Sequence, residues 1–498
     1  MKLSFKYLAL LALVLCTRSA FAQPGFSETV TSFAENKTLN GGNDFWFAPI
    51  QNYVDADGKY IKIYIASLTS TVAYIEYGGH TESVKISNGG YRMFDLPLNI
   101  ELKSSGVVEN KAIHVWSPLS NLSVYVMSHY AFSSDGFYCI PTPELGTDYV
   151  VAGYESLIRA FDTIVYDLPS EFTITSNRDN TIVEITPTCD LRQSNIYPTN
   201  NKTVAYPQGQ KFFVTLNRGQ AVQYQAVLAQ ADGYDVTGTI IHSNNPVGVV
   251  GGSMMSDIPS GFDSPDYICD MMPPVSAWGE TYYVTNPVQP QGMTGHDFSM
   301  YCMISSVPDQ TIYRHDCATG SHTEAVLGPK YDHYYVEEES ANKWYSDQPF
   351  LLVQYLNSST YPDYMNGNGD PAEVVINPKE NFTKDVFFQT ANSFGAEAPF
   401  DNYANVFVDV TDEKGTTFDG EKITKFAKQC LDGKYEVFLV PHIVPGANEV
   451  KSDSGVGVYL YGYGYSESYA WAGSLGILIG GIFYLTGTPW LNQIQYSW

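Results

Sequence analysis

Oxygen-bearing side chains crowd the segment from 363 to 370, which reads D-Y-M-N-G-N-G-D. Carboxylate and amide oxygens are the ligands that Ca²⁺ prefers, and extracellular modules often bind this ion weakly through such loops. The candidate ligands are Asp363, Asn366, Asn368 and Asp370. Their spacing does not match an EF-hand loop, and Asn-Gly is also a common hairpin turn. We therefore predict no cofactor other than a weak calcium site in this segment.

The patterns that mark common catalytic sites are absent from the sequence. It contains no G-x-S-x-G elbow, no H-E-x-x-H zinc motif, no Walker loop and no Rossmann glycine pattern. Gly251-Gly252-Ser253 approximates the elbow, but it follows an apolar run, and we interpret it as a strand end. We predict that the chain is not an enzyme. The alternative is a glycan-processing hydrolase, which would need two carboxylates within about 10 Å across a cleft.

Histidine and cysteine spacings give no metal motif. His315, His322 and His333 surround Cys317, but at separations that fit no common ligand pattern, so we interpret them as ordinary surface or sheet histidines. Cys16 would be lost with a signal peptide, which leaves six cysteines and room for three disulfides in an oxidising compartment. The sequence leaves their connectivity open. The candidates are Cys139, Cys189, Cys269, Cys302, Cys317 and Cys430.

The N-terminus indicates export. Lys2 and Lys6 precede an apolar run, and Ala20-Phe21-Ala22 suits signal peptidase, which predicts a signal peptide over 1–22 and a mature start at Gln23. N-x-S/T sequons support a secreted, extracellular glycoprotein with sugars on exposed turns. The predicted glycosylation sites are Asn36, Asn121, Asn201, Asn357 and Asn381.

The charge of the chain limits its partners. Removing residues 1–22 takes away three cations and no acid, so the formal charge moves from −26 to −29. Such a polyanion is repelled by nucleic acid and by anionic lipid, so we expect neither as a partner. The apolar segment 470–485 is short for a membrane span. We expect a last core strand with a packed tail there, and membrane association is the alternative.

Short apolar runs rich in Val, Ile, Thr, Tyr and Phe, bounded by turns, predict an all-β chain. The one helical candidate is the stretch 423–430. Tyrosines at 459, 461, 463 and 465 could form either strand core or an exposed binding face. The expected strands are 60–66, 172–175, 211–216, 239–242, 350–355, 406–410 and 455–461.

Three markers recur in the same order along the chain. The first is an apolar strand that turns at a hydroxyl residue and resumes at threonine, as a hairpin would, at 67–71, 176–181, 306–311 and 411–416. The second is a serine- and proline-containing turn before a strand, at 117–118, 243–246 and 346–349. The third is an aspartate eight residues before a proline: Asp135 with Pro143, Asp266 with Pro274, and Asp370 with Pro378.

These repeats predict about four divergent β-units, near 40–155, 160–290, 293–392 and 400–475. Their length suits tandem β-sandwich-like units, and a circular, propeller-like arrangement of the repeats is the alternative. The corresponding domains are 1–22 signal peptide, 23–159 N-terminal β region, 160–475 the next three units, and 476–498 a C-terminal tail.

Several segments follow the pattern of a known family: Thr237–Ile241 with Pro246–Val249, Pro273–Gly279 with Tyr282–Val284, Phe172–Thr181, and Tyr459–Gly464 with Ser468-Tyr469. They resemble the N-terminal domain of the IgGFc-binding protein family. The match runs in order over about 160–475, with looser echoes at 145–149 and 42–46. The resemblance implies an extracellular, mucus- or surface-associated glycoprotein that binds proteins or glycans, with no catalytic residues to carry over.

The chain departs from the vertebrate namesake, because this region is not followed by cysteine-dense von Willebrand type D repeats. The resemblance therefore carries over neither mucin cross-linking nor Fc binding. We expect a secreted recognition or adhesion protein whose partners are extracellular proteins or glycans, in mucus, matrix or innate defence. A self-associating structural coat component is a further alternative.

Overall fold

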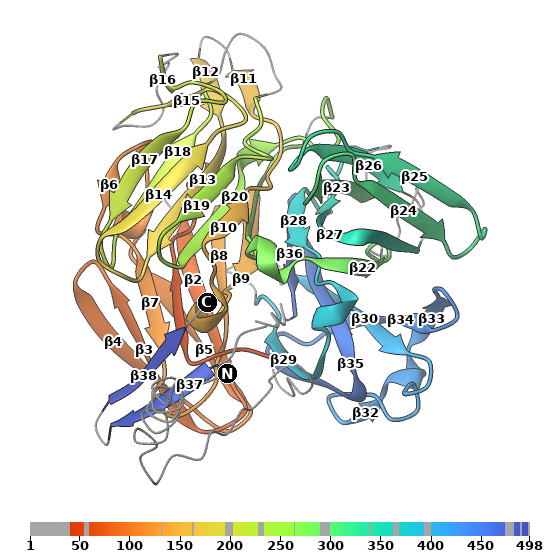
Figure 1. Ribbon diagram of the computed structural model, residues 1–498. Coiled ribbons are helices and arrows are strands. Elements are labelled where there is room, and N and C mark those ends of the chain that lie inside the picture. Colours follow the sequence, from red (N-terminus) through yellow and green to blue (C-terminus); the bar gives the residue numbers. More distant parts are fainter. Residues whose placement is uncertain are drawn as a thin grey trace, which may run out of the picture. The chain divides into compact units, whose positions relative to one another are not determined.

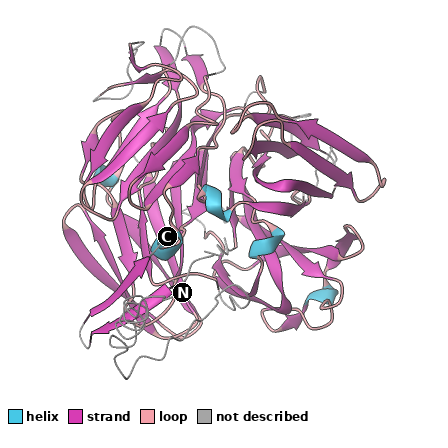
Figure 2. Cartoon of the chain, in the orientation of Figure 1, coloured by secondary structure: helices cyan, strands magenta, loops and turns pink. Residues whose placement is uncertain are grey.

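The computed structural model describes residues 40–53, 59–130, 132–161, 164–194, 203–227, 234–262, 264–288, 299–338, 341–361, 368–392, 400–473, 483–488 and 491–496. The chain is all-β, as the sequence predicts. The helices in the described part are single 3-10 turns of three residues (Figure 2). Residues 37–478 form one compact unit, and residues 1–36 with 479–498 form another. In the second unit the described strands are the hairpin β37 (Phe483–Thr488) and β38 (Leu491–Tyr496).

The larger body consists of four β-units that follow one another along the chain (Figure 1). Each of the first two units has two antiparallel four-stranded arrangements, an outer and an inner sheet. The first unit comprises β1 (Asp44–Phe47), β2 (Tyr60–Ser67), β3 (Thr71–Tyr77), β4 (His80–Ile86), β5 (Gly90–Leu96), β7 (Ile113–Trp116), β8 (Ser123–Tyr130) and β9 (Ser133–Tyr138). The second comprises β10 (Asp148–Val150), β13 (Ser170–Ser176), β14 (Thr181–Thr186), β17 (Phe212–Leu216), β18 (Ala221–Gln225), β19 (Ile240–Ser243), β20 (Val247–Ser256) and β21 (Asp266–Met271).

The strand order is the same in both of these units. The outer sheets run β1-β7-β3-β4 and β10-β19-β14-β17, and the inner sheets run β5-β2-β8-β9 and β18-β13-β20-β21. β6 (Val108–Glu109) adds to the edge strand β18 of the second inner sheet. The second unit also carries the small hairpins of β11 (Leu157–Phe161) with β12 (Ile164–Leu168) and β15 (Leu191–Arg192) with β16 (Val204–Tyr206).

In the third and fourth units one long strand serves both sheets. Residues 342–345 of β27 pair with outer strands β22 and β24, and residues 350–356 pair with inner strands β23 and β28. β35 is divided in the same way. Its residues 447–451 pair with outer strands β29 and β31, and its residues 456–464 pair with inner strands β30 and β36. The third unit comprises β22 (Gly279–Val284), β23 (Ser299–Ser305), β24 (Thr311–Asp316), β25 (His322–Val326), β26 (His333–Glu338), β27 (Asn342–Leu356) and β28 (Ala372–Val375). The fourth comprises β29 (Thr383–Gln389), β30 (Asp401–Asp409), β31 (Thr417–Phe418), β32 (Glu421–Lys422), β33 (Ala427–Cys430), β34 (Tyr435–Ile443), β35 (Ala447–Gly464) and β36 (Glu467–Ala472).

The first two sequence markers lie where the chain crosses between the two sheets of a unit. In the first unit Ser67 ends inner strand β2 and Thr71 begins outer strand β3. In the second unit Ser176 ends inner strand β13 and Thr181 begins outer strand β14. The predicted hairpin is therefore wrong, because the two flanking strands belong to different sheets and do not pair. The hydroxyl pair holds this arch, since Ser176 Oγ donates to Thr181 Oγ1 at 2.8 Å.

The last strands of the four units form a ring. β9 contacts β21 and β36, and β28 contacts the same two strands, which gives the four-bladed, propeller-like arrangement that the sequence left as an alternative. Pro141, Pro274 and Pro378 begin the 3-10 turns η3 (Thr142–Glu144), η4 (Val275–Ala277) and η5 (Lys379–Asn381), which lead from the ring into the next outer sheet. Because β10 (Asp148–Val150) pairs with β19 in the second outer sheet, these residues already belong to the second unit.

The hydrophobic core is continuous between neighbouring units. One buried cluster joins Ile174 and Val249 of the second unit to Cys302 and Val353 of the third. A second cluster joins the third unit to the fourth and includes Tyr459, Tyr461 and Tyr463. Of the two alternatives for these tyrosines, strand core therefore holds for Tyr459, Tyr461 and Tyr463, whose rings fill an inter-unit core, while Tyr465 is 63% exposed.

Two further local predictions concern single segments. The helical candidate at 423–430 is not a helix: one 3-10 turn, η6 (Ile423–Lys425), is soon followed by β33, whose backbone pairs with β34. The apolar segment 470–485 overlaps β36 only at residues 470–472 and β37 at residues 483–485, and residues 474–482 lie outside the described part, so the last core strand with its packed tail stays a prediction. No helix within the described residues is long and apolar enough to cross a membrane.

Candidate functional site

A fully buried polar site lies at the ring of last strands, where Asp135 binds the backbone of all four units. One carboxylate oxygen accepts the N–H groups of Gly136 and Ala470 at 2.8 and 3.2 Å. The other accepts those of Cys269 and Glu373 at 3.0 and 2.9 Å. These donors lie on β9, β36, β21 and β28. Burial raises the pKa of Asp135, and the four N–H groups oppose that rise because they favour the carboxylate.

The second and third marker aspartates meet at one end of this ring. Asp266 Oδ1 accepts the N–H groups of Ser134 and Tyr267 at 2.7 and 2.6 Å. The N–H of Asp370 donates to Ser468 Oγ at 2.8 Å, and Ser134 Oγ donates to the Ser468 carbonyl at 3.0 Å. Strands β21, β9 and β36 and the segment just before β28 thus share one chain of hydrogen bonds.

The charges of these two carboxyls are poorly compensated. Asp266 Oδ2 and Asp370 Oδ1 are buried and have no hydrogen-bond partner among the described residues. Burial raises the pKa of both groups, and the charge of Asp370 raises that of Asp266 further. Glu373 is similar, since neither of its oxygens has a described partner and burial raises its pKa. A buried carboxyl of this kind favours its neutral form.

The ring is closed between the first and fourth units by Asn40. Its side-chain amide donates to the carbonyls of Phe387 and Gly473 at 2.9 and 3.0 Å, and its Oδ1 accepts the Phe387 N–H at 2.7 Å. Ser123 Oγ donates to the same Phe387 carbonyl at 2.6 Å. One buried amide therefore joins the chain before β1 to β29 and to the end of β36.

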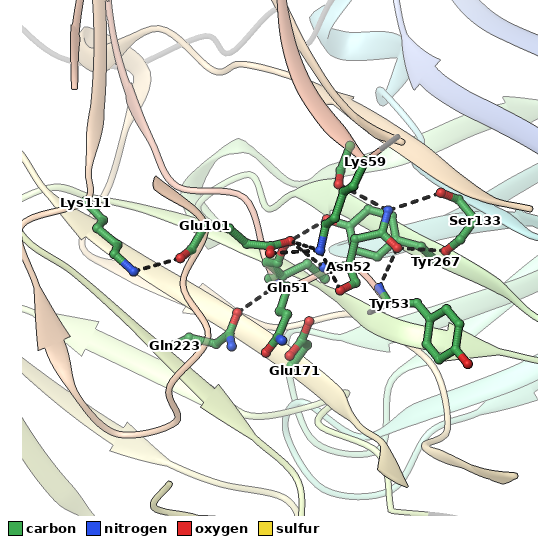
Figure 3. A network of polar contacts seen from close by, with 12 residues as sticks. Gln51, Asn52, Tyr53, Lys59, Glu101, Lys111, Ser133, Glu171, Gln223 and Tyr267 are labelled. Atoms are coloured by element: carbon green, nitrogen blue, oxygen red, sulfur yellow. Dashed lines mark hydrogen bonds and ion pairs between the residues drawn. The ribbon is translucent and has the colours of Figure 1, made fainter. Parts of the chain in front are cut away.

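A buried ion pair occupies the boundary of the first and second units (Figure 3). Lys59 Nζ lies 2.7 Å from Glu101 Oε1 and donates to the Asn52 carbonyl at 3.0 Å. The Asn52 N–H donates to Glu101, and the Gln51 N–H donates to Gln223 Oε1 at 2.9 Å. Burial raises the pKa of Glu101, and Lys59 opposes this. Because these groups are enclosed, we interpret the network as a joint between units and not as a ligand site.

An open cleft of about 510 Å³ lies beside β3 and β4 of the first unit. We call it the Tyr77 cleft. Tyr77 OH donates to Glu82 Oε1 at 2.5 Å, and this bond raises the pKa of Tyr77. Lys111 Nζ is held by Glu109 and by the Glu101 carbonyl. The lining residues are Tyr77, Gly78, His80, Glu82, Pro97, Asn99, Ile100, Asn110 and Lys111.

The volume of the Tyr77 cleft lies within the range of small-molecule sites, which commonly enclose about 300–1,000 Å³. Its lining is more polar than is usual for such sites, which favours a polar ligand. Glu82 is the one carboxylate among the lining residues. No sequence motif marks the cleft, because its lining comes from a hairpin, the segment after β5 and the approach to β7.

The predicted calcium ligands are divided. Asp363 and Asn366 lie outside the described residues, Asn368 bridges to Tyr465, and Asp370 is buried at the ring. Within the described residues no three His, Cys, Asp or Glu side chains are grouped to hold a metal ion. His315 and His322, which the sequence analysis interprets as ordinary surface or sheet histidines, face each other across β24 and β25 with 3.1 Å between nitrogens.

The six cysteines are free thiols in the structure, and the disulfides for which the sequence leaves room stay a prediction. Cys139, Cys189, Cys269 and Cys302 are buried in different strands and connections, where they act as small apolar core residues. Burial raises the pKa of the Cys139, Cys269 and Cys302 thiols, which suppresses the reactive thiolate. Ser253 is likewise buried, inside β20.

The sequons differ in accessibility. Asn121 is exposed and Asn357 is half-buried. Asn381 is 8% exposed and its amide nitrogen donates to the Ala277 carbonyl at 3.0 Å, which argues against a glycan there in the folded chain. Asn36 and Asn201 lie outside the described residues, as does the predicted signal peptide.

Comparison with known proteins gives one family. The family model described as IgGFc binding protein matches residues 135–462, from the ring strand β9 to the end of β35. No curated protein matches the chain. Among solved structures, the BSP domain of a biofilm associated protein is 6% identical, with 90% of this chain and 98% of that chain covered and a TM-score of 0.17. A Ca²⁺-stabilised adhesin with which an Antarctic bacterium binds ice is 9% identical, with 87% and 99% covered and a TM-score of 0.11.

Proposed function

The chain belongs to the IgGFc binding protein family, and we propose that it is a secreted recognition or adhesion protein that binds an extracellular glycan or glycoprotein. We propose the Tyr77 cleft as the binding site on its geometry alone, because its lining residues precede the matched residues 135–462. The observation that carries the proposal is the open cleft of about 510 Å³ with polar side chains along its wall. The family description supports a binding role, and the export signal and sequons support an extracellular one.

The cleft favours a neutral, hydroxyl-rich ligand. Asn99 and Asn110 supply amide groups, Glu82 supplies a carboxylate acceptor and Tyr77 supplies an aromatic ring. Lys111, the one Lys or Arg among the lining residues, already binds Glu109 and a carbonyl. An anionic sugar would therefore meet the Glu82 charge without an unpaired cation to offset it.

The first experiment is capture of the mature chain, residues 23–498, on an array of neutral and sulfated or sialylated glycans. We expect saturable binding to neutral glycans that Glu82→Gln weakens by roughly tenfold to a hundredfold, the effect of losing a charged hydrogen bond. Glu421→Gln is the matched control, because Glu421 lies on β32, the outer-sheet edge strand of the fourth unit that corresponds to β4.

Binding that Glu82→Gln and Glu421→Gln leave equally strong would place the ligand elsewhere. Hydrolysis of a bound glycan would instead favour an enzyme. The array is run with and without Ca²⁺, because Asp370 of the predicted calcium segment has a buried carboxylate oxygen with no described partner. Ligand capture that requires Ca²⁺, and that is lost in an Asp370→Asn variant shown by circular dichroism to be folded, would support a calcium ion bound at Asp370.

A further inference from the structure

Two histidines face each other on the outer sheet of the third unit. His315 of β24 and His322 of β25 are directly opposite in the antiparallel register. Their ring centroids are 4.4 Å apart, and Nδ1 of His315 lies 3.1 Å from Nε2 of His322. His322 is exposed and His315 is partly exposed. Solvent therefore reaches a pair of imidazole nitrogens that the β-sheet register holds side by side.

The separation of these nitrogens fits two adjacent positions on one metal ion. Imidazole binds Zn²⁺ at about 2.0–2.1 Å, so ligand angles between square and tetrahedral place two bound nitrogens roughly 2.9–3.4 Å apart. The observed 3.1 Å lies inside that interval. In the free protein the same nitrogens share one hydrogen bond, which an ion would replace with two coordinate bonds.

The charged groups around the pair allow a cation to bind. Glu324 is exposed and stands two residues after His322, so both side chains are on the same face of β25. Lys343 of β27 lies on the other side of His315, but its ammonium is 3.0 Å from Asp432 Oδ2 and is paired there. Arg314 and Asp316 alternate with His315 and therefore belong to the opposite face of β24.

We propose that His315 and His322 form a surface site for a divalent transition-metal ion of the Zn²⁺ or Cu²⁺ class. Imidazole selects such ions over Ca²⁺ and Mg²⁺, which prefer oxygen ligands. No third His, Cys, Asp or Glu among the described residues completes the site, so water occupies the remaining positions of the bound ion and a donor group of a partner can replace it. This site is independent of the Tyr77 cleft, which belongs to the first unit.

The test is calorimetric titration of the chelator-stripped mature chain with Zn²⁺, beside Ca²⁺ and Mg²⁺. We expect one saturable Zn²⁺ site that is lost in both His315→Ala and His322→Ala and unchanged in His242→Ala. His242 is the matched control because it is also exposed on an outer sheet, where it pairs with Asp148 at 2.7 Å. Circular dichroism of each variant confirms that it is folded.

Spectroscopy of the unaltered chain provides a second measurement that does not depend on any variant. With one equivalent of Cu²⁺, electron paramagnetic resonance should show nitrogen couplings from two imidazoles. Zn²⁺ binding that survives both substitutions, no Zn²⁺ binding at all, or a Cu²⁺ spectrum without imidazole nitrogen would each overturn the proposal.

Discussion

The ring axis and the Tyr77 cleft both gather polar side chains, yet they use them in opposite ways. At the ring, the two carboxylate oxygens of Asp135 accept hydrogen bonds from four backbone N–H groups, one from each unit, and the residue is fully buried. At the cleft, Glu82 is exposed and has one described partner, Tyr77. Oxygens bound to the backbone hold strands together, whereas oxygens that face an open volume can bind a ligand.

The difference also separates the two classes of polar residue in this chain. Substitutions at the ring should change folding and leave ligand contacts untouched, while substitutions at the cleft should do the reverse. Measuring stability and ligand capture on the same variants therefore tests whether the two regions are as distinct as their geometry indicates.

The largest effect is expected for Asp135→Ala. It leaves four buried N–H groups without an acceptor, and each such group costs about 1–3 kcal/mol. We expect a loss of several kcal/mol in the free energy of unfolding, which is enough to prevent folding of a marginally stable chain. Urea unfolding followed by tryptophan fluorescence measures it.

Asp135→Asn is the milder variant, because asparagine keeps one of the two acceptor oxygens. It should destabilise the chain less than Asp135→Ala. If the Asp135→Ala variant unfolded at the same urea concentration as the wild type, the stability of the ring would not depend on Asp135.

An intermediate and pH-dependent effect is expected for Asp266→Asn. Burial raises the pKa of Asp266 in the folded chain above its value in the unfolded chain, so the folded chain binds the proton more tightly. The contribution of Asp266 to the free energy of unfolding therefore falls as the pH rises past about 4, the ordinary pKa of aspartate. The amide mimics the protonated acid. The stability of Asp266→Asn relative to the wild type should therefore increase between pH 5 and pH 8, as thermal melts at both values would show.

Asp95→Asn is the control for that experiment, because Asp95 is exposed and ion-paired to Lys62 on the first inner sheet. A relative stability of Asp266→Asn that is the same at pH 5 and pH 8 would mean that Asp266 is ionised throughout and compensated by a cation.

Strand positions were predictable from the sequence because alternating apolar residues report which face of a sheet is buried. The unit count followed from the repeats, which mark the arches between sheets. The three marker aspartates are not all at equivalent positions. Asp266 and Asp370 each lie eight residues before the proline that begins a 3-10 turn. In the first unit that proline is Pro141 and not Pro143, so Asp135 lies two residues further along its unit than the other two aspartates. That displacement places Asp135 deeper in the ring, where it meets four strands.

The sites themselves were not predictable, because they depend on pairings that join distant residues. His315 and His322 meet through a strand register, and Asn40 meets Phe387 across 347 positions of the chain. The family resemblance indicated the right family, but it gave no residues for a site. Each of these contacts is set by how two sheets are placed, which local periodicity does not encode.

The smallest effect on stability is expected for Glu82→Gln, the variant expected to lose ligand. Glu82 is exposed, and glutamine keeps an oxygen that can accept the Tyr77 hydroxyl, so the free energy of unfolding should change by no more than about 0.5 kcal/mol. The Tyr77 hydroxyl should also titrate at lower pH, because the carboxylate that raises its pKa is gone. Ultraviolet difference spectra follow that titration. If Glu82→Gln destabilised the chain as strongly as Asp135→Ala, the cleft would be part of the structural polar network, and the contrast between the two regions would fail.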